Sequence, residues 1–449
     1  MSSNWETVKL GDFCSKIGSG STPRGGSNIY LDIGQFALIR SQNILNNSFS
    51  INGLVYIDAN EANKLKNVSV EENDVLLNIT GDSVARVCKA PKEYLPARVN
   101  QHVAIIRADE INLDSSYLNY YLNSLDMQNY MLSLASTGAT RNALTKNMIE
   151  NFEIIKPPLQ TQKKISHILS TLDDKIELNR KMNQTLESMA SAIFKSWFVD
   201  FDPVHAKANC TDEAELKNIA KELGISKTIL DLFPSEFEES ELGMIPKGWE
   251  DTELSHICKI QSGYAFKSDW WQDTGVKVIK IKNIDGNRVN TLDCECVSEE
   301  IATKNSNFKL SSGDMLIAMT GATVGKVGVI YTADEEYLLN QRVGRFQPIA
   351  YYDEYVKIFA NSSKFFQSIQ GQAQGSAQPN ISAREIESVK IIKPNDEIMK
   401  TFSLLLNPFF SKILEHQGEI QTLEKTRDTL LPKLLSGEID VSDLSLEME

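Results

Sequence analysis

The chain has 449 residues and a formal net charge of −14, and 41% of its residues are hydrophobic and 24% charged. Because a single hydrophobic core stops growing at about 250 to 300 residues, this length predicts two or more domains. The composition is ordinary for a globular protein and excludes wholesale disorder.

The sequence contains no apolar run of about 18 residues, the length of a membrane-spanning helix. Met1 to Trp5 has neither the basic start nor the apolar stretch of a signal peptide. We therefore expect a cytoplasmic protein with no membrane partner. The six cysteines are scattered without the spacing of a zinc site, so we expect reduced thiols and no bound metal.

The negative net charge argues against a nucleic-acid partner, because phosphate neutralisation requires Lys and Arg. Many of the acids, however, are concentrated in two segments. Between Lys207 and Lys247 there are nine acids and five bases, and from Glu438 to Glu449 there are five acids and no base. A local positive surface elsewhere on the chain is therefore compatible with the composition.

Two copies of one plan follow each other along the chain. Trp5-Glu6 opens the first copy, which reaches Ser19-Gly20, and Trp249-Glu250 opens the second, which reaches Ser262-Gly263. Further matches keep a nearly constant shift: Asn73–Gly81 with Gly313–Gly321, Asn100-Gln101 with Asn340-Gln341, and Ile154–Pro157 with Ile391–Pro394. The sequence thus indicates an internal duplication with small loop changes.

Each copy begins with a globular domain, which we place at residues 1–157 and 248–394. Short stretches of β-branched alternation, such as Val278 to Lys282, are separated by Gly and Asn turns and a few helical segments. This pattern predicts an α+β fold class, with two tandem mixed α and β domains of about 150 residues each.

A long helical pattern follows each globular domain, over residues 158–199 and 395–436. Apolar positions alternate by four and three for about four heptads, which is typical of a coiled coil. Polar Asn179, Asn183 and His416 interrupt this seam and are predicted to fix its register. The residues predicted to pair the helices are Leu169, Leu172, Ile176, Leu186 and Ile193 in the first and Phe409, Ile413, Ile420, Leu423 and Leu430 in the second.

If a pseudo-twofold axis relates the copies, the two helices form an antiparallel coiled coil that separates the globular domains. From Thr161 to Trp197 the first helix would extend roughly 55 Å, at about 1.5 Å per residue, which makes it a spacer. The alternative is that each helix packs on its own globular domain.

Residues 200–247 form a linker between the copies, and residues 437–449 form an acidic tail. We expect one short helix in the linker, capped by Thr211-Asp212 and ended by Gly224. The acidic stretch Glu236–Glu241 is predicted to be a solvated surface loop.

No motif predicts a catalytic residue, a metal ligand or a cofactor site in this chain. Gly321–Lys326 has three residues between its glycines where a phosphate-binding P-loop has four, and no Ser or Thr follows. Asn407–Phe410 is similar to the Asn-Pro-Pro-Phe of adenine methyltransferases but lacks the second Pro and a Gly-rich cofactor turn. His102 and His205 are candidates for phosphate contacts, although surface or core roles are commoner.

Four segments carry a family resemblance: Ser191–Phe201 (SAIFKSWFVDF), Glu241–Trp249 (ELGMIPKGW), Gln374–Ser382 (QGSAQPNIS) and Leu430–Ile439 (LLPKLLSGEI). Together with the tandem layout, they resemble the specificity (S) subunits of type I restriction-modification systems. The first copy departs from the third segment, because Thr137–Leu144 contains no Pro. The resemblance covers essentially the whole chain.

The resemblance implies that each globular domain is a target-recognition domain that reads one half of a split, asymmetric site in double-stranded DNA. The helices would set the spacing and bind methyltransferase (M) subunits, which use S-adenosylmethionine to methylate adenine N6. Restriction (R) subunits would add translocation and cleavage that require ATP and Mg. This chain would be a non-catalytic subunit without a cofactor of its own. Domains facing one side of the duplex would read half-sites about one turn, ~34 to 36 Å, apart.

Exposed Arg, Lys, Asn, Gln, Ser and Thr side chains on loops can reach base edges and phosphates. On this basis we predict DNA contacts from Ser19, Thr22, Arg24, Arg40, Ser41, Asn43, Arg86 and Arg141 in the first domain and from Lys280, Lys282, Asn283, Lys326, Arg342 and Gln378 in the second. The recurrence of Asn100-Gln101 as Asn340-Gln341 indicates shared structure, because residues that read different half-sites should differ between the copies.

Two alternatives stay open. A fused restriction or methyltransferase enzyme would require a cofactor loop or a metal-ligand cluster. A duplicated protein-interaction scaffold would bind peptides in place of DNA.

Overall fold

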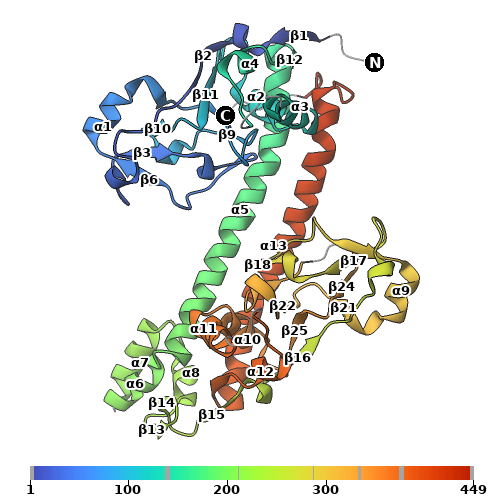
Figure 1. Ribbon diagram of the computed structural model, residues 1–449. Helices are drawn as coiled ribbons and strands as arrows, with labels where there is room; N and C mark the ends of the chain where they lie inside the picture. Colours follow the sequence, from blue (N-terminus) through green and yellow to red (C-terminus); the bar gives the residue numbers. More distant parts are fainter. Residues whose placement is uncertain are drawn as a thin grey trace. The chain divides into compact units, whose positions relative to one another are not determined.

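The computed structural model describes residues 5–136, 142–210, 212–286, 288–331, 335–373 and 379–444. The chain divides into two compact units: unit 1 comprises Met1–Lys175 and Leu423–Glu449, and unit 2 comprises Ile176–Thr422. Two continuous helices of 40 residues, α5 (Leu159–Phe198) and α13 (Asp396–Leu435), contribute to both units (Figure 1). Among the described residues, no helix has the length and apolar character needed to cross a membrane.

The globular part of unit 1 contains two four-stranded sheets. The sheet β2-β11-β8-β9 is antiparallel, and the sheet β6-β3-β10-β7 contains the parallel pair β3–β10. Their strands are β2 (Cys14–Ser19), β3 (Phe36–Ile39), β6 (Val55–Ile57), β7 (Ser69–Val70), β8 (Val75–Asn78), β9 (Val87–Lys89), β10 (Ala97–Val99) and β11 (Val103–Ala108).

The sheet β2-β11-β8-β9 lies between two hydrophobic cores, so its central strands are apolar on both faces. Successive side chains of a strand point to opposite faces. In β8, the fully buried Leu76 therefore packs toward the other sheet. Its neighbour Leu77 packs toward α2 (Ser115–Leu122), α3 (Leu125–Ser136) and the parts of α5 and α13 that belong to unit 1.

Short elements complete the first domain. Its first and last strands, β1 (Glu6–Lys9) and β12 (Glu153–Lys156), pair antiparallel, with Glu6 opposite Lys156. The remaining elements are the hairpin β4 (Ile44–Leu45) and β5 (Ser48–Phe49) and the helices α1 (Ala59–Lys64) and α4 (Lys146–Glu150).

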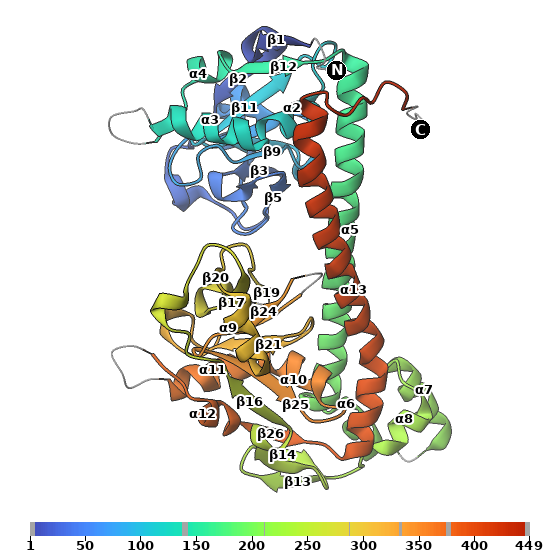
Figure 2. The same ribbon diagram turned by 90° about the vertical axis from the view of Figure 1, so that its right-hand side faces the viewer.

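Unit 2 repeats this topology, as the duplication predicted (Figure 2). The order β16-β25-β22-β23 corresponds to β2-β11-β8-β9, and β20-β17-β24-β21 corresponds to β6-β3-β10-β7, with β17–β24 as the parallel pair. The pair β15–β26 takes the place of β1–β12. In unit 2, however, the hairpin β18–β19 joins the larger sheet through β23, whereas β4–β5 forms a separate sheet.

The strands of the second domain are β15 (Glu250–Glu253), β16 (Cys258–Ser262), β17 (Val276–Ile279), β18 (Ile284–Gly286), β19 (Arg288–Val289), β20 (Glu295–Val297), β21 (Lys309–Leu310), β22 (Met315–Ala318), β23 (Val327–Val329), β24 (Tyr337–Leu339), β25 (Val343–Pro348) and β26 (Lys390–Lys393). Its helices are α9 (Glu299–Lys304), α10 (Asp353–Ala360), α11 (Ser363–Gln372) and α12 (Ala383–Glu387).

The two long helices pair in antiparallel orientation. In unit 2, Asn179 Nδ2 donates to Glu419 Oε2 (2.8 Å), and one turn further along α5, Asn183 Oδ1 accepts from His416 Nδ1 (2.7 Å). A forward step along α5 thus corresponds to a backward step along α13. In unit 1, Arg427 Nη1 of α13 donates to Asp173 Oδ1 of α5 (2.7 Å). The predicted antiparallel coiled coil is confirmed.

The predicted seam residues differ in burial. Leu169, Ile176, Ile413 and Ile420 are at most 3% exposed, whereas Leu172, Leu186, Ile193, Phe409, Leu423 and Leu430 are half-buried. Near its C-terminal end, α5 also packs on the second domain, where Phe194 contacts Tyr355 of α10 and Phe402 of α13. The alternative in which each helix packs only on its own globular domain is therefore wrong.

The prediction of one short helix in the linker is wrong. Residues 202–232 contain three helices, α6 (Asp202–Asn209), α7 (Glu213–Glu222) and α8 (Lys227–Leu232). The predicted helix is α7, whose first N–H groups are capped by the Asp212 carboxylate; Thr211 lies outside the described residues. Helices α6 and α8 span only eight and six residues, too few for a helical period to appear in the sequence.

The acidic stretch of the linker is also not the predicted loop. Phe237–Ser240 forms β13, which pairs with β14 (Gly243–Pro246) in an antiparallel hairpin. The linker is anchored on unit 2 by buried Phe233, whose ring lies 5.1 Å from that of Trp197 and 6.4 Å from that of Trp249. Tertiary packing of aromatic residues thus orders a segment whose acidic composition is typical of loops.

Candidate nucleic-acid interface

In unit 1, several loops meet at one end of the sheet β2-β11-β8-β9. Gly20 N, after β2, donates to Val103 O (2.9 Å), and Ile79 N, after β8, donates to His102 O (2.9 Å). We call the side chains gathered there loop cluster 1, which consists of Ser19, Thr80, Arg86, Gln101 and His102. Thr80 and His102 are half-buried and the other three are exposed.

The loops of unit 2 have the same backbone arrangement. Gly263 N donates to Val343 O (3.1 Å) and Met319 N to Arg342 O (3.0 Å), in the positions of the two bonds in unit 1. The corresponding side chains form loop cluster 2, which consists of Ser262, Thr320, Lys326, Gln341 and Arg342. All of them except Lys326 line an open cavity of about 710 Å³, which residues 379–383 also border.

The repeated Ser-Gly pairs are explained by the close approach of two loops. A Cβ on Gly20 would collide with the carbonyl oxygens of Val99 and Asn100, and a Cβ on Gly263 with those of Leu339 and Asn340. Only glycine lets the end of the first sheet strand lie directly against the turn that precedes β11 or β25. The serine before each glycine is exposed at the edge of the cluster.

Each loop cluster has a basic side chain at the same position. Asn78 N donates to Arg86 O and Ala318 N to Lys326 O, both at 2.9 Å, so Arg86 and Lys326 occupy equivalent places after β8 and β22. The preceding residue, Ala85 or Gly325, has a positive φ in both copies (73° and 82°). Neither basic side chain has an ion-pair partner within the described ranges, so both charges are available to an anion.

The turn containing Arg40 in unit 1 and Lys280 in unit 2 is different, because its basic residues are already engaged. Arg40 donates to Gly53 O and lies 5.4 Å from the centroid of the Tyr30 ring. Lys280 pairs with Glu295 and lies 3.5 Å from the Trp271 centroid. Lys282 pairs with Asp293 (3.1 Å). A DNA phosphate would have to displace these partners.

Two predicted contact residues are used by the fold itself. Asn43 and Asn283 are 0% and 2% exposed. Each Oδ1 accepts the backbone N–H of residue 40 or 280 (3.0 and 2.9 Å), and each Nδ2 donates to Ser50 O or Asn290 O (2.9 Å in both). These amides hold the turn and present no free edge to a base. The turn thus has the same structural role in both copies.

The other predicted contact residues differ in exposure. Arg24 is exposed and Thr22 and Ser41 are half-buried, whereas Arg141 and Gln378 lie outside the described residues. Asn100 and Asn340 have the shared structural role expected of them, because each Oδ1 accepts the N–H of the residue two positions on (3.1 and 3.5 Å). His205 lies in the linker, with its ring centroid 4.6 Å from that of Phe237.

Sequence reasoning did not single out Thr80, Gln101, Thr320 and Gln341 as contact residues. The signal that would have found them is the repeat, because the shift that relates Asn100 to Asn340 also relates each member of loop cluster 1 from Thr80 onward to a member of loop cluster 2. Sequence reasoning also missed an ion pair that both copies contain, Arg107 with Asp74 and Arg345 with Asp314.

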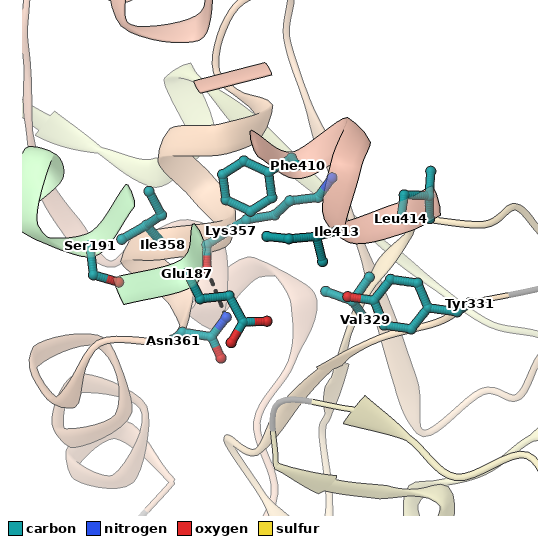
Figure 3. Close-up of a pocket in the computed structure, with 11 residues that line it drawn as sticks. Glu187, Ser191, Val329, Tyr331, Lys357, Ile358, Asn361, Phe410, Ile413 and Leu414 are labelled. Carbon is teal, nitrogen blue, oxygen red and sulfur yellow. Dashed lines mark hydrogen bonds between the residues drawn. The ribbon is translucent and has the colours of Figure 1, made fainter. Parts of the chain in front are cut away.

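A separate, mostly apolar cavity of about 270 Å³ lies in unit 2 beside the helices (Figure 3). It is lined by side chains from α5 (Glu187 and Ser191), from α13 (Phe410, Ile413 and Leu414) and from α10 (Lys357 and Ile358). Asn361, which follows α10, and Gly313, Val329 and Tyr331 complete the lining. Burial raises the pKa of the Glu187 carboxyl, and Arg288 partly offsets this increase. Within the described ranges, no group of three or more His, Cys, Asp or Glu side chains is placed to hold a metal ion.

Comparisons with known proteins identify the family. A family model described as "Type I restriction modification DNA specificity domain" matches residues 2–188 and 246–425. The chain is 26% identical to the type I restriction enzyme MjaIX specificity subunit of Methanocaldococcus jannaschii, over 98% of this chain and 95% of that protein. It is also 26% identical to the HindI specificity subunit of Haemophilus influenzae, over 97% of this chain and 100% of that protein.

The fold has a solved counterpart. The crystal structure of the type I restriction-modification S subunit from M. genitalium superimposes with a TM-score of 0.55 at 14% sequence identity, covering 96% of both chains. This likeness supports the α+β fold class with two repeated domains and long helices.

Because the family model matches most of both copies, the chain belongs to the DNA specificity subunits of type I restriction-modification systems. In this family catalysis lies in partner subunits, so the chain is not itself the enzyme. Neither alternative, the fused enzyme or the interaction scaffold, finds support.

Proposed function

We propose that this chain reads a bipartite, asymmetric site in double-stranded DNA and thereby directs adenine N6 methylation and restriction by partner subunits. The observation that carries this proposal is the pair of loop clusters. Two domains present the same backbone frame and place an equivalent cation on it, Arg86 or Lys326, with no ion-pair partner among the described residues. Beside this cation lies a position that differs between the copies. Such an arrangement suits common phosphate contacts combined with different base contacts.

The proposed contacts fall into two groups. Arg86 and Lys326 bind phosphates, with Ser19, Thr22, Arg24 and Ser41 as neighbouring contributors in the first domain. In the second domain, Arg342 reads a base edge. Arg40, Lys280 and Lys282 would join only after exchanging their present partners, and Asn43 and Asn283 stay with the fold. The DNA contacts of Arg141 and Gln378 remain predictions.

The rest of the chain supports these readers. In this proposal residues 1–157 and 248–394 are target-recognition domains, residues 158–199 and 395–436 are spacer helices that also bind M subunits, and residues 200–247 and 437–449 are the linker and acidic tail. The unbroken 40-residue length of each helix supports a spacer role. The M subunits would supply S-adenosylmethionine chemistry and the R subunits ATP- and Mg-dependent cleavage, all in the cytoplasm.

A reconstituted complex tests the proposal. The chain alone should transfer no methyl group, whereas the chain with its M subunits should methylate one interrupted DNA sequence. Replacing Lys9–Arg141 with the equivalent part of a relative should change only one half of that sequence. The readout is base-resolution mapping of N6-methyladenine. Methyl transfer by the isolated chain, or a swap that changes both halves, would contradict the proposal.

A further inference from the structure

We infer that the position occupied by His102 in loop cluster 1 and by Arg342 in loop cluster 2 is a specificity-determining position, at which each domain selects one base of its half-site. The inference rests on the proposed function and deepens it. It also assigns a chemistry to each domain: Arg342 selects guanine, and His102 makes a single hydrogen bond to a base edge.

The position is special because the other members of the two loop clusters are the same or similar in both copies. Ser19 corresponds to Ser262, Thr80 to Thr320 and Gln101 to Gln341, and the basic residue is kept as Arg86 or Lys326. The carbonyl of the divergent residue accepts the same backbone bond in each unit, from Ile79 N (2.9 Å) or Met319 N (3.0 Å). Matched surroundings point to a shared mode of docking, so a single divergent side chain at their centre distinguishes what is read.

The two side chains differ in the contacts that they can make. Arg342 is exposed, lines the open cavity of unit 2, and has no hydrogen-bond or ion-pair partner for its guanidinium within the described ranges. A guanidinium offers a planar fork of donors and no acceptor, which matches O6 and N7 of guanine in the major groove. The other residues that line the cavity are uncharged, some polar and some apolar, which suits the edge of a base.

His102 cannot make that contact. Its Nδ1 is hydrogen-bonded to Thr80 Oγ1 (2.6 Å), which fixes the ring, and its Nε2 lies 3.3 Å from Gln101 Nε2. Both ring nitrogens are thus engaged, and a base edge can reach the ring only by replacing Gln101 at Nε2. A single exchangeable position excludes bidentate recognition of guanine.

In unit 2, the threonine equivalent to Thr80 lacks this hydrogen bond among the described residues. Thr320 Oγ1 is buried and has no hydrogen-bond partner within the described residues, although the equivalent Thr80 Oγ1 is bonded to the histidine. A histidine at position 342 would therefore find the same anchor that His102 has. The substitution Arg342→His converts the chemistry of cluster 2 into that of cluster 1 without requiring a new supporting residue.

The experiment compares the full chain and the Arg342→His and Arg342→Lys variants, each assembled with the M subunits on a randomised DNA library. Base-resolution mapping of N6-methyladenine gives the target of each complex. We expect both variants to keep the half-site of the first domain. Arg342→His should lose preference for guanine at one position of the other half-site by about 5- to 150-fold, whereas Arg342→Lys, which can still contact guanine, should keep part of this preference. The reciprocal variant His102→Arg should change one position in the half-site of the first domain only.

Arg288→Ala is the matched control, because Arg288 is an exposed arginine of the same domain that lies beside α5 and outside loop cluster 2. It should leave the target unchanged. An unchanged target in both Arg342 variants, or a uniform loss of methylation with the same base preferences, would overturn the inference and assign Arg342 to the fold or to a phosphate. A wild-type complex that methylates no interrupted sequence would instead contradict the proposed function.

Discussion

The buried side chain of Asn183 on α5 accepts a hydrogen bond from His416 on α13 through Oδ1 (2.7 Å) and donates from Nδ2 to Ile413 O (3.4 Å). The two residues are 1% and 3% exposed. A polar pair inside an otherwise apolar seam favours one alignment of two helices, because a shift of one turn breaks the hydrogen bond between its two buried members. Asn183 and His416 therefore fix the antiparallel register.

Replacing Asn183 with Leu should lower the free energy of unfolding by about 1 to 3 kcal/mol, because the buried His416 ring then loses its hydrogen bond to Asn183 Oδ1. The double variant Asn183→Leu/His416→Leu should recover most of this loss, since two apolar residues of similar size pack together. Denaturant unfolding of the full chain measures both values. If the double variant loses as much as the sum of the two single variants, the pair does not act as a unit.

Glu187→Gln should stabilise the protein at neutral pH. Glu187 is exposed as a residue, but its carboxyl is partly desolvated in the cavity. This desolvation raises its folded-state pKa above the ordinary value of 4.5, so folding favours the protonated carboxyl. The stability due to this group is fully present below the unfolded pKa and is lost as the pH rises through the raised folded pKa. Glutamine mimics the protonated form, so the variant should gain in melting temperature at neutral pH and match the wild type near pH 4.

The control for Glu187 is Glu177→Gln, ten residues earlier on the same helix, where the carboxylate forms an exposed pair with Lys181 (3.6 Å). Removing an exposed pair should change stability by less than about 1 kcal/mol. An equal gain from both substitutions would mean that the effect reflects the overall negative charge of the chain and not the burial of Glu187.

Arg86→Ala and Lys326→Ala should weaken DNA binding by the assembled complex for all sequences alike. Each removes one phosphate contact, so the slope of the logarithm of affinity against the logarithm of salt concentration should decrease by about 1 for each. Gel-shift titrations at several salt concentrations measure this slope. Lys304→Ala, which removes an exposed lysine paired with Glu300, should leave it unchanged. A change of target sequence in either variant would mean that the replaced residue contacts a base and not a phosphate.

Gly263→Ala should damage the second domain selectively. The added methyl group meets the backbone carbonyls of Leu339 and Asn340, which cannot move without displacing the turn before β25. Overpacking of this kind costs about 1 to 3 kcal/mol. Calorimetry should show the loss, and methylation mapping should show a weakened half-site for that domain alone. Gly418→Ala in α13 is the control with the opposite sign, since a methyl group there meets no atom within 4 Å and helix propensity improves by about 0.5 to 1 kcal/mol.

The features that repeat along the chain were predictable from the sequence. The seam was visible because Leu169, Ile176, Ile413 and Ile420 keep a period of four and three over many turns, and the polar Asn183 and His416 stood out against it. The duplication itself came from matching segments at a constant shift. A period is a local property of the sequence, so it can be detected without knowledge of the fold.

Features that depend on tertiary contacts were not predictable. Helices α6 and α8 are too short to show a period, and they are ordered by burial of Val204 and Leu230. Asn43 was predicted to meet DNA because asparagine is frequent at such contacts, but its side chain is fully buried in a turn. The pairing of Thr80 with His102, 22 residues apart, could not be inferred, because their proximity depends on the pairing of β8 with β11.

The antiparallel pairs β1–β12 and β15–β26 place the entry and exit of each globular domain on neighbouring strands, about 4.7 to 4.9 Å apart. Everything between such a pair is an insert whose two ends are adjacent. Genetic recombination can therefore interchange whole inserts while the paired helices are inherited intact. A population holding several variants of each insert would gain every combination of the two, without altering the paired helices.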